Sequence, residues 1–277
     1  MKNKRFHNSF QLNESTFSSE EELLEFSKTI SLSISTFISN WFSAADFIEV
    51  QTSGSTGNPK PIKIQKKFMI NSALATGSFF GLKEKTTALL CMSTDFIAGK
   101  MMLVRALVLG WELDVIAPVS NPLKNTRKHY DFSAMVPMQL QNSLSEIERI
   151  KKLIVGGGIV SETLEKKLQQ VSTEVFATFG MTETITHIAV RKLNNLLKTE
   201  QIPTSHYNVL PNIFISKDDR DCLVITAPKI TNSKKVVTND VVSIISKDEF
   251  QWLGRFDNVI NSGGIKLHPE IIEKKLS

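Results

Sequence analysis

The chain has 277 residues, of which 41% are hydrophobic and 22% are charged, a composition typical of a soluble globular protein. Its formal net charge is +5, but basic and acidic residues are interleaved along the chain. This argues against a nucleic-acid-binding surface and suits anionic small substrates. The apolar segment 101–111 is too short to cross a membrane and contains Arg105, so we expect no membrane insertion.

The N-terminus and the two cysteines indicate a cellular location. Residues 1–6 are basic, but the apolar segment of a signal peptide does not follow them. Cys91 and Cys222 each lie in an apolar stretch, without the spacing of a metal or redox site. Both are therefore expected to be buried in a reducing compartment. We expect a cytoplasmic protein, and the sequence does not indicate an oligomeric state.

The first predicted elements are helical. Ser18 and Ser19 precede an acidic turn that begins at Glu20, which is a helix-start signal. Apolar residues then recur from Leu23 to Trp41 and predict a packing helix or a helix pair. A short predicted strand at the end of this region leads into a loop rich in Gly, Ser and Thr.

Beyond this loop, short apolar runs alternate with helical segments. Predicted strands cover residues 86–92, 111–118, 131–137 and 151–158, and a predicted helix covers residues 98–110. Strands that alternate with helices favour an α/β fold with a largely parallel sheet.

From about residue 200 the pattern becomes β-rich. Residues 213–226 predict two strands around a polar turn, and two further strand-like runs follow before residue 256. The longest predicted loops are residues 121–128 and 201–212. We therefore expect nucleotide- and acid-binding α/β subdomains in residues 1–200 and a smaller β-rich subdomain in residues 201–256.

Residues 52–60 (TSGSTGNPK) carry the sharpest local signal and follow a predicted strand. Glycines let the backbone approach a phosphate chain, hydroxyls and amides donate to its oxygens, and Lys60 supplies positive charge. The spacing differs from a Walker loop, in which the lysine directly follows a glycine. We predict a phosphate-binding loop, with a flexible surface turn as the alternative.

Two further motifs follow predicted strands. The glycines at 156–158 would let a flat ring lie against the backbone, although glycine is also common at ordinary strand-to-helix turns. Residues 179–183 (FGMTE) place a hydroxyl beside a carboxylate, which suits a phosphate and Mg²⁺. An exposed polar turn is the alternative for this segment.

Asp240 and Arg255 form the last candidate pair. An acidic side chain can accept hydrogen bonds from two ribose hydroxyls, and an arginine can hold a ribose or a phosphate. The two residues could equally form a surface ion pair of little consequence.

These motifs, in this order, resemble the adenylate-forming superfamily of acyl-CoA synthetases, firefly luciferases and peptide-synthetase adenylation domains. The resemblance covers residues 50–273. TSGSTGNPK resembles the family's phosphate loop, FGMTE its Thr-Glu motif, TND its ribose-binding motif, and GRFDNVINSGG with HPEIIE its hinge motif. The resemblance implies the large N-terminal domain of such an enzyme, with layered αβ subdomains and a smaller β-rich subdomain toward the C-terminus.

The resemblance also implies residues that would contact the ATP phosphates. Those implied to hold the β and γ phosphates are Ser53, Gly54, Ser55, Thr56, Gly57 and Lys60. Thr182 would contact the α phosphate and Glu183 would bind Mg²⁺. Together with Lys60, these two are the implied catalytic residues.

The nucleoside would lie on a different set of residues. By resemblance, Gly157 and Gly158 would line the adenine pocket, Asp240 would bind the ribose hydroxyls and Arg255 would support the ribose. Asp257 would lie at the hinge about which a small lid domain turns.

The chain departs from the family pattern at two motif positions and at its C-terminal end. Pro61 replaces the glycine after the lysine and Asn239 replaces the glycine of T-G-D, and neither change removes a charged or hydroxyl contact. In the family, a C-terminal lid domain supplies a catalytic lysine. Residues 257–277 would be the hinge and the start of that lid, and we expect the lid and its lysine to be missing from this chain.

The spacing from Ile260 to Pro269 resembles the o-succinylbenzoate-CoA ligases of menaquinone biosynthesis. Their acid carries an aromatic ring and two carboxylates, so its pocket should contain a cation. Lys100 is the favoured candidate, and Arg105 fits a role at the rim of the core at least as well. His187, close behind the Thr-Glu motif, could line the acid pocket.

In the implied reaction, ATP donates AMP to a carboxylic acid, and the acyl group is then transferred to coenzyme A. Mg²⁺ is the implied cofactor. Two alternatives remain: an aryl-acid adenylation domain that loads a carrier protein, and an ATP- or AMP-binding module with little turnover. A hydrolytic NTPase fits least, because the Walker spacing is lacking.

Overall fold

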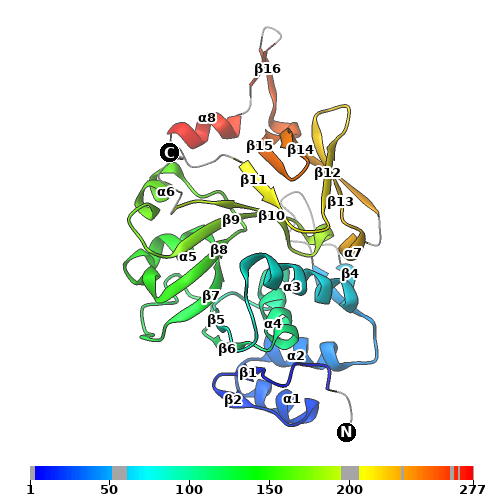
Figure 1. Cartoon of the computed structure of the whole chain (residues 1–277), viewed down its shortest axis with the longest axis vertical. Helices are drawn as coiled ribbons and strands as arrows, with labels where there is room; N and C mark the ends of the chain where they lie inside the picture. The colour runs from blue at the N-terminus through cyan, green and yellow to red at the C-terminus, as the bar shows by residue number, and fades with distance from the viewer. Residues whose placement is uncertain are drawn as a thin grey trace. The chain divides into compact units, whose positions relative to one another are not determined.

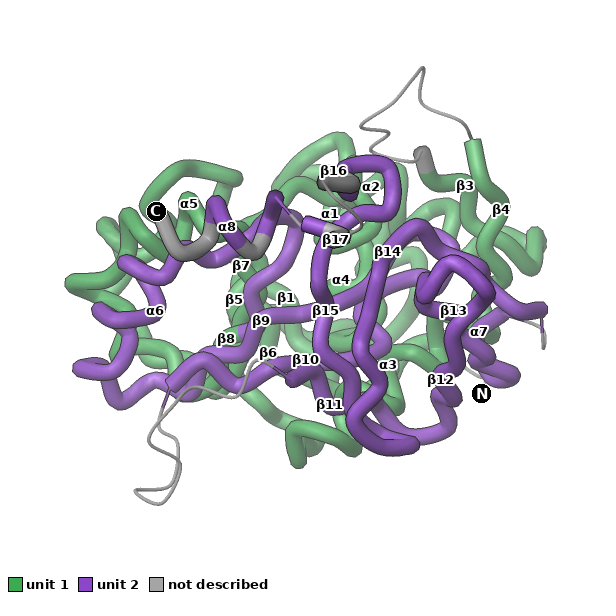
Figure 2. The backbone as a smooth tube through the Cα atoms, turned by 90° about the horizontal axis from the view of Figure 1, so that it is seen from above, with its two compact units in different colours: residues 1–153 green, residues 154–277 purple. Residues whose placement is uncertain are grey.

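The computed structural model describes residues 4–51, 61–194, 206–231, 234–262, 265–267 and 269–276. The chain divides into two compact units, Met1–Leu153 and Ile154–Ser277 (Figure 2). Each unit combines helices with strands, which confirms the predicted α/β class. The predicted subdomain boundary at residue 200 falls within residues 195–205, outside the described residues.

The first unit contains a mostly parallel sheet. Its strands are β1 (Gln11–Leu12), β2 (Ser15–Thr16), β5 (Thr87–Leu90), β6 (Glu112–Val115) and β7 (Tyr130–Met135). β5 pairs in parallel with β6 and with β7, and β1 pairs in parallel with β6, which gives the order β7-β5-β6-β1-β2. A separate antiparallel pair joins β3 (Phe47–Gln51) to β4 (Pro61–Gln65). The predicted phosphate loop connects these two strands.

The helices of the first unit are α1 (Glu20–Lys28), α2 (Leu32–Phe42), α3 (Lys66–Phe80), α4 (Ile97–Leu109), α5 (Pro137–Asn142) and the 3₁₀ helix η1 (Leu144–Arg149). The predicted N-terminal helical region is a pair rather than one helix. The reason is a second start signal, since Ser19 accepts the Glu22 N–H and Ser31 accepts the Ile34 N–H. No described helix combines the length and apolar composition needed to cross a membrane.

α4 is the most deeply buried helix of this unit. Its residues Met101–Leu107 are all buried, as expected for a helix that is apolar all round, and it lies beside α3 (Figure 1). In its first turn, a Cβ on Gly99 would lie 2.2 Å from the carbonyl oxygen of Ser93. The turn that precedes α4 therefore requires a residue without a side chain at this position.

We predict that Gly99→Ala lowers the free energy of unfolding by about 1–3 kcal/mol, because the methyl group overlaps backbone that cannot move independently. Chemical denaturation of the purified variant measures this change. Ala98 is exposed in the same turn, so Ala98→Ser is the matched control and should change stability by under about 0.5 kcal/mol. Equal effects at both positions would contradict the steric argument.

The second unit is built on antiparallel strands. They are β9 (Glu174–Gly180), β10 (His187–Lys192), β11 (His206–Val209), β12 (Phe214–Lys217), β13 (Cys222–Thr226), β14 (Lys235–Ser246) and β15 (Glu249–Arg255). Their order is β12-β13-β14-β15-β11-β10-β9, and β8 (Ile150–Val155), which crosses the unit boundary, follows β9. The helices are α6 (Glu162–Leu168), η2 (Thr182–Thr184), α7 (Pro228–Thr231), η3 (Phe256–Asn258) and α8 (Pro269–Leu276).

β11 corrects one sequence prediction. Residues 201–212 were expected to form a long loop, but His206–Val209 pair with β10 and with β15. The reason is that Tyr207 packs against aromatic residues that are distant in the sequence. It stacks on Phe250, with ring centroids 5.5 Å apart, and meets Phe179 edge to face, with ring centroids 5.7 Å apart. The local sequence of β11 is polar and does not show this partner.

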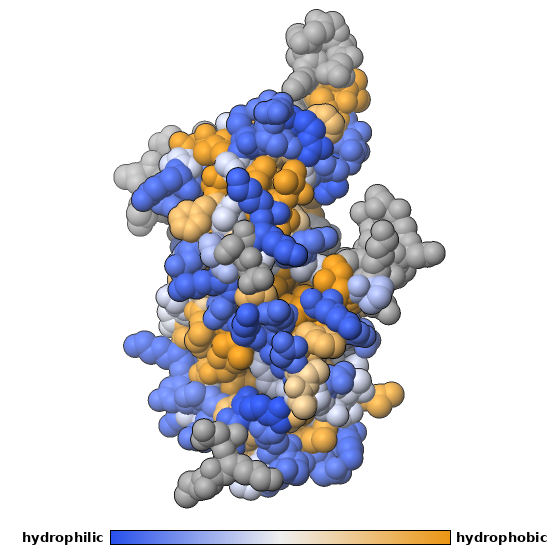
Figure 3. Space-filling view, turned by 90° about the vertical axis from the view of Figure 1, so that its right-hand side faces the viewer, coloured by the Kyte–Doolittle hydropathy of each residue, from blue (hydrophilic) through white to orange (hydrophobic). Residues whose placement is uncertain are grey.

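A small hairpin and a helix follow β15. The hairpin pairs β16 (Ile260–Ser262) with β17 (Ile265–Leu267), and Ile260 lies opposite Leu267. Both side chains are exposed, and Figure 3 shows apolar surface at the base of this hairpin. α8 packs against β15, so the predicted hinge motif is in contact with the β-rich part of the second unit.

Candidate functional site

The second unit contains a cavity of about 430 Å³, within the range of small-molecule sites. Its lining comes from the turn after β8, the end of β9, and β10, β11, β14, β15 and α8. The lining residues are Gly158, Ile159, Val160, Glu162, Ala177, Thr178, Phe179, Gly180, Met181, Arg191, Tyr207, Asp240, Gln251, Trp252, Arg255 and Glu270. Three residues of the predicted site, Gly158, Asp240 and Arg255, therefore face one cavity.

The glycine run after β8 forms one edge of the cavity. Gly157 has φ +76°, which L side chains rarely adopt, and it turns the chain so that the exposed Gly158 lines the cavity. Gly156 meets β9 closely, since a Cβ there would lie 2.4 Å from the Thr178 hydroxyl. That hydroxyl donates to the Val155 carbonyl at 3.1 Å.

Gly180 ends β9 and has a packing role. It pairs with His187 of β10, and a Cβ at Gly180 would lie 2.4 Å from the Thr186 carbonyl oxygen and 2.5 Å from the His187 Cα. The glycine of FGMTE is therefore required by the approach of β10. His187 itself is buried and does not line the cavity, so its contact with an acid substrate stays a prediction.

Two of the residues predicted to contact the phosphates or their Mg²⁺ come directly after a residue that lines the cavity. Met181 lines the cavity, and Thr182 and Glu183 come next in η2. The turn is held by the Thr184 hydroxyl, which lies 2.9 Å from the Thr186 carbonyl and accepts the Met181 N–H at 3.2 Å. Thr182 is half-buried and Glu183 is exposed, so both are open to a ligand that extends beyond Met181.

Glu183 is the one residue predicted to hold Mg²⁺. The described residues contain no group of three or more His, Cys, Asp or Glu side chains arranged to hold a metal ion. Mg²⁺ commonly takes most of its oxygen ligands from nucleotide phosphates and water, and a single carboxylate such as that of Glu183 suits such an ion.

Asp240 is a buried acid of the cavity. The residue is 7% exposed, and burial raises the pKa of its carboxyl above the ordinary value for aspartate. The Trp252 indole N–H donates to Oδ1 at 3.0 Å, and the Arg255 guanidinium lies 3.8 Å from the same oxygen. These two groups oppose the effect of burial and favour the carboxylate.

Glu270 joins α8 to the same site. Its Oε1 accepts the Arg255 backbone N–H at 3.1 Å and the Asn258 side-chain amide at 2.6 Å. A Cβ on Gly254 would lie 2.4 Å from the other Glu270 oxygen. Glu270 thereby fixes the backbone of the residue whose guanidinium reaches Asp240.

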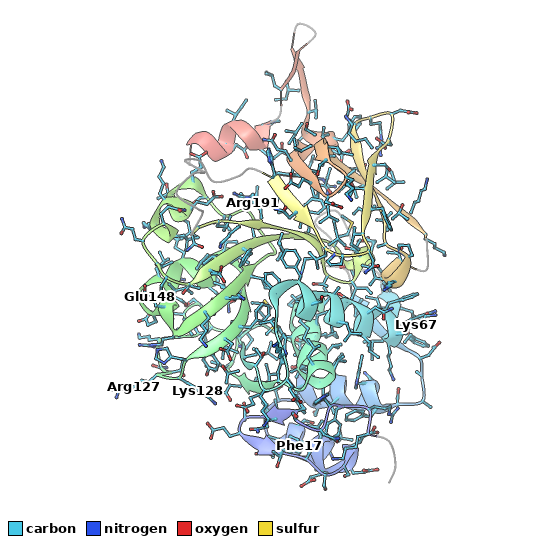
Figure 4. All side chains as sticks on the ribbon, in the orientation of Figure 1. Phe17, Lys67, Arg127, Lys128, Glu148 and Arg191 are labelled. Atoms are coloured by element: carbon cyan, nitrogen blue, oxygen red, sulfur yellow. The ribbon has the colours of Figure 1, made fainter. Side chains whose placement is uncertain are left out.

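A buried ion pair forms another part of the cavity wall. Arg191 on β10 (Figure 4) donates two hydrogen bonds to Glu165 of α6, at 2.7 Å and 3.3 Å, and both residues are 6% exposed. The Arg191 guanidinium also lies over the Tyr207 ring, 5.9 Å from its centroid. Charges this deeply buried depend on their partner.

We predict that Arg191→Met lowers the free energy of unfolding by about 3–5 kcal/mol, because it leaves the Glu165 carboxylate buried without its cation. Denaturant unfolding measures this change. The double variant Arg191→Met/Glu165→Leu removes both charges and should recover most of the loss. A double variant no more stable than Arg191→Met would show that the pair is not the cause.

The cations predicted to bind the acid lie in the first unit. Lys100 is half-buried, and its ammonium donates to the carbonyls of Thr94 and Asp95 at 2.6 Å and 2.7 Å. Burial lowers its pKa, and its role toward a substrate stays a prediction. Arg105 is 2% exposed, its Nε donates to the Thr76 hydroxyl at 3.3 Å, and burial lowers its pKa to about 10. This agrees with a place in the core.

The residues of the predicted phosphate loop lie outside the described residues, namely Ser53, Gly54, Ser55, Thr56, Gly57 and Lys60. Trp252, Arg191, Tyr207 and Glu270 line the cavity and were not predicted from the sequence. Strand pairing brings Arg191, Tyr207 and Trp252 there, and no local motif marks those three. Glu270 belongs to the HPEIIE segment of the hinge motif, which does not by itself assign it a place in the cavity.

Comparison with known proteins identifies the family of the chain. Residues 19–212 match the family described as AMP-binding enzyme. The chain therefore belongs to the AMP-binding enzyme family, which confirms the resemblance drawn from its motifs. It spans about half the length of the curated relatives it matches.

Individual relatives are named as acyl-CoA synthetases or acid–CoA ligases. It is 39% identical to an acyl-CoA synthetase (AMP-forming)/AMP-acid ligase II-like protein from Dyadobacter fermentans, with a TM-score of 0.76 over 88% of this chain and 70% of that one. It is 24% identical to 2-succinylbenzoate–CoA ligase from Staphylococcus aureus, over 80% of this chain and 50% of the relative. The fold also resembles o-succinylbenzoate coenzyme A synthetase from Bacillus subtilis in complex with ATP and magnesium ion, at 20% identity and a TM-score of 0.70 over 82% and 54% of the two chains.

Proposed function

We propose that the cavity of the second unit binds the adenosine part of ATP and AMP, and that the chain activates a carboxylic acid as its acyl-adenylate. One observation carries this proposal. Gly158, Asp240 and Arg255, which come from three motifs far apart in the sequence, line a single cavity. Asp240 offers a carboxylate to the ribose hydroxyls, and the backbone at Gly158 lets the flat adenine ring approach closely.

In the proposed reaction, a carboxylate oxygen of the acid attacks the α phosphorus of ATP. A P–O bond forms, the bond to the β phosphate breaks, and pyrophosphate leaves. In a second step the sulfur of coenzyme A attacks the acyl carbon, AMP leaves, and the thiol proton passes to solvent. The chain contributes positioning and charge stabilisation rather than a nucleophile. Thr182 and the loop 52–60 would contact the phosphates, and Glu183 would hold the Mg²⁺ that neutralises their charge.

For the acid, we propose o-succinylbenzoate. The name of the Staphylococcus aureus relative supports this assignment, as does the Bacillus subtilis enzyme of similar fold. The SGG run at residues 262–264, within the segment that resembles the o-succinylbenzoate-CoA ligases, also supports it. Coenzyme A is the proposed acceptor on the same grounds.

We predict that Asp240→Asn weakens AMP binding by about 10- to 100-fold, because hydrogen bonds to a charged acceptor contribute about 1.5–3 kcal/mol. Isothermal titration calorimetry measures the change. Burial raises the Asp240 pKa, so the carboxylate protonates at a higher pH than an exposed aspartate does. The ratio of wild-type to Asp240→Asn affinity should therefore shrink as the pH falls through this raised pKa.

Comparing the two proteins at each pH cancels the titration of the AMP phosphate, which is the same for both. A ratio that stays constant between neutral pH and the point of acid unfolding would contradict a role for the ionised Asp240. Equal affinity of the two proteins at neutral pH would remove Asp240 from the site.

We predict that o-succinylbenzoate stimulates exchange of labelled pyrophosphate into ATP, and that benzoate, which lacks the succinyl carboxylate, does so at least about tenfold less. AMP binding without exchange for any acid would instead favour a nucleotide-binding module with little turnover. Exchange followed by transfer to a phosphopantetheine carrier, but not to free coenzyme A, would favour the carrier-loading alternative.

A further inference from the structure

The pairing of β14 with β15 contains an irregularity beside Asp240. Asp240 lies opposite Arg255 and Val241 lies opposite Gly254, but Val242 lies opposite Trp252 rather than Leu253. Opposed residues of an antiparallel pair share a face of the sheet, and one extra residue in a strand moves the following side chain to the other face. The bulge therefore presents Trp252, not Leu253, on the face that carries Asp240.

Gly254 makes this bulge possible. Its φ is +143°, a conformation that L side chains rarely adopt. A side chain at this position would also collide with the Glu270 carboxylate. The local geometry of β15 is thus arranged to bring an indole to the cavity, and Trp252 lines it together with Asp240.

The contacts of the Asp240 carboxylate with Trp252 and Arg255 both involve Oδ1 rather than Oδ2. The Trp252 Nε1 donates to Oδ1 at 3.0 Å, and Arg255 Nη1 approaches that same oxygen at 3.8 Å. The torsion that rotates a carboxylate about its Cβ–Cγ bond has broad, shallow preferences, so the group needs a partner to hold one orientation. A neutral, rigid N–H supplies this at Oδ1 and leaves Oδ2 for a ligand.

We propose that Trp252 is a positioning residue for ribose recognition: its indole N–H fixes the Asp240 carboxylate so that Oδ2 accepts hydrogen bonds from the ribose hydroxyls. The proposal rests on the proposed function, in which this cavity holds the adenosine part of the nucleotide. Trp252 then raises the affinity for the nucleotide by orienting Asp240, and this gain requires the ribose hydroxyls. A direct contact between the indole ring and the base would raise the affinity whether or not the ribose carries its hydroxyls.

The test compares AMP with 2′,3′-dideoxy-AMP by isothermal titration calorimetry. Trp252→Phe keeps an aromatic ring and removes the donor. It should weaken AMP binding by about tenfold, the effect of one hydrogen bond to a charged group, and should weaken binding of the dideoxy analogue by less than about twofold. In an Asp240→Asn background, Trp252→Phe should cause no further loss for AMP.

Trp41→Phe is the matched control, since Trp41 is a buried tryptophan of the first unit, and it should leave the ratio between the two ligands unchanged. Equal losses for AMP and the dideoxy analogue in Trp252→Phe would overturn the proposal, and so would no loss for either. If the wild-type protein does not bind AMP, the proposed function itself fails. If the wild-type protein binds AMP and Trp252→Phe gives either of these results, only the role of Trp252 fails.

A second measurement needs no change at Trp252. The chain has three tryptophans, and the indole N–H signal that remains in a Trp41→Phe/Trp111→Phe variant belongs to Trp252. AMP should shift this signal strongly in a ¹⁵N-correlated NMR spectrum, and the dideoxy analogue should shift it much less. Equal shifts with both ligands, or no shift with AMP, would overturn the proposal.

Discussion

The geometry of the site is arranged around one buried carboxylate, that of Asp240. Removing a carboxylate from water is costly unless donors and a cation take the place of water, and Asp240 is 7% exposed. Trp252 and Arg255 supply these contacts, both toward Oδ1. The bulge in β15 and the glycine at 254 shape the backbone that brings those two side chains to Asp240, and the Glu270 carboxylate holds that backbone at Arg255.

Part of this site could be predicted because some of its residues belong to recognisable short motifs. Gly158, Asp240 and Arg255 each belong to a short pattern whose residue types suit a nucleotide, and they line the same cavity. Trp252 could not be predicted, because alternation along a regular strand places Leu253 on the face that Trp252 occupies. Tyr207 lies in a short strand whose aromatic partners are Phe179 and Phe250, and nothing in the local sequence indicates those contacts.

The fold was predictable to a similar degree. Alternating apolar runs and helical segments indicated the α/β class, and the serine before each N-terminal helix explains why the expected helical region is a pair. The motif around Gly180 also reflects constraints of packing and backbone conformation. Its glycine is required by the contact with β10, and the β-branched Ile185 has φ +69° in the turn after the Thr-Glu pair. Such backbone costs about 1–3 kcal/mol and persists where the surroundings impose it.

The attachment of α8 has a practical consequence for protein engineering. Because Glu270 accepts the Arg255 backbone N–H and the Asn258 amide, the last helix supports the strand that carries Trp252 and Arg255. A shortened version that ended before Pro269 would keep Gly158, Asp240 and Arg255 and lose this support. Fragments intended for ligand screening or crystallisation should therefore retain α8.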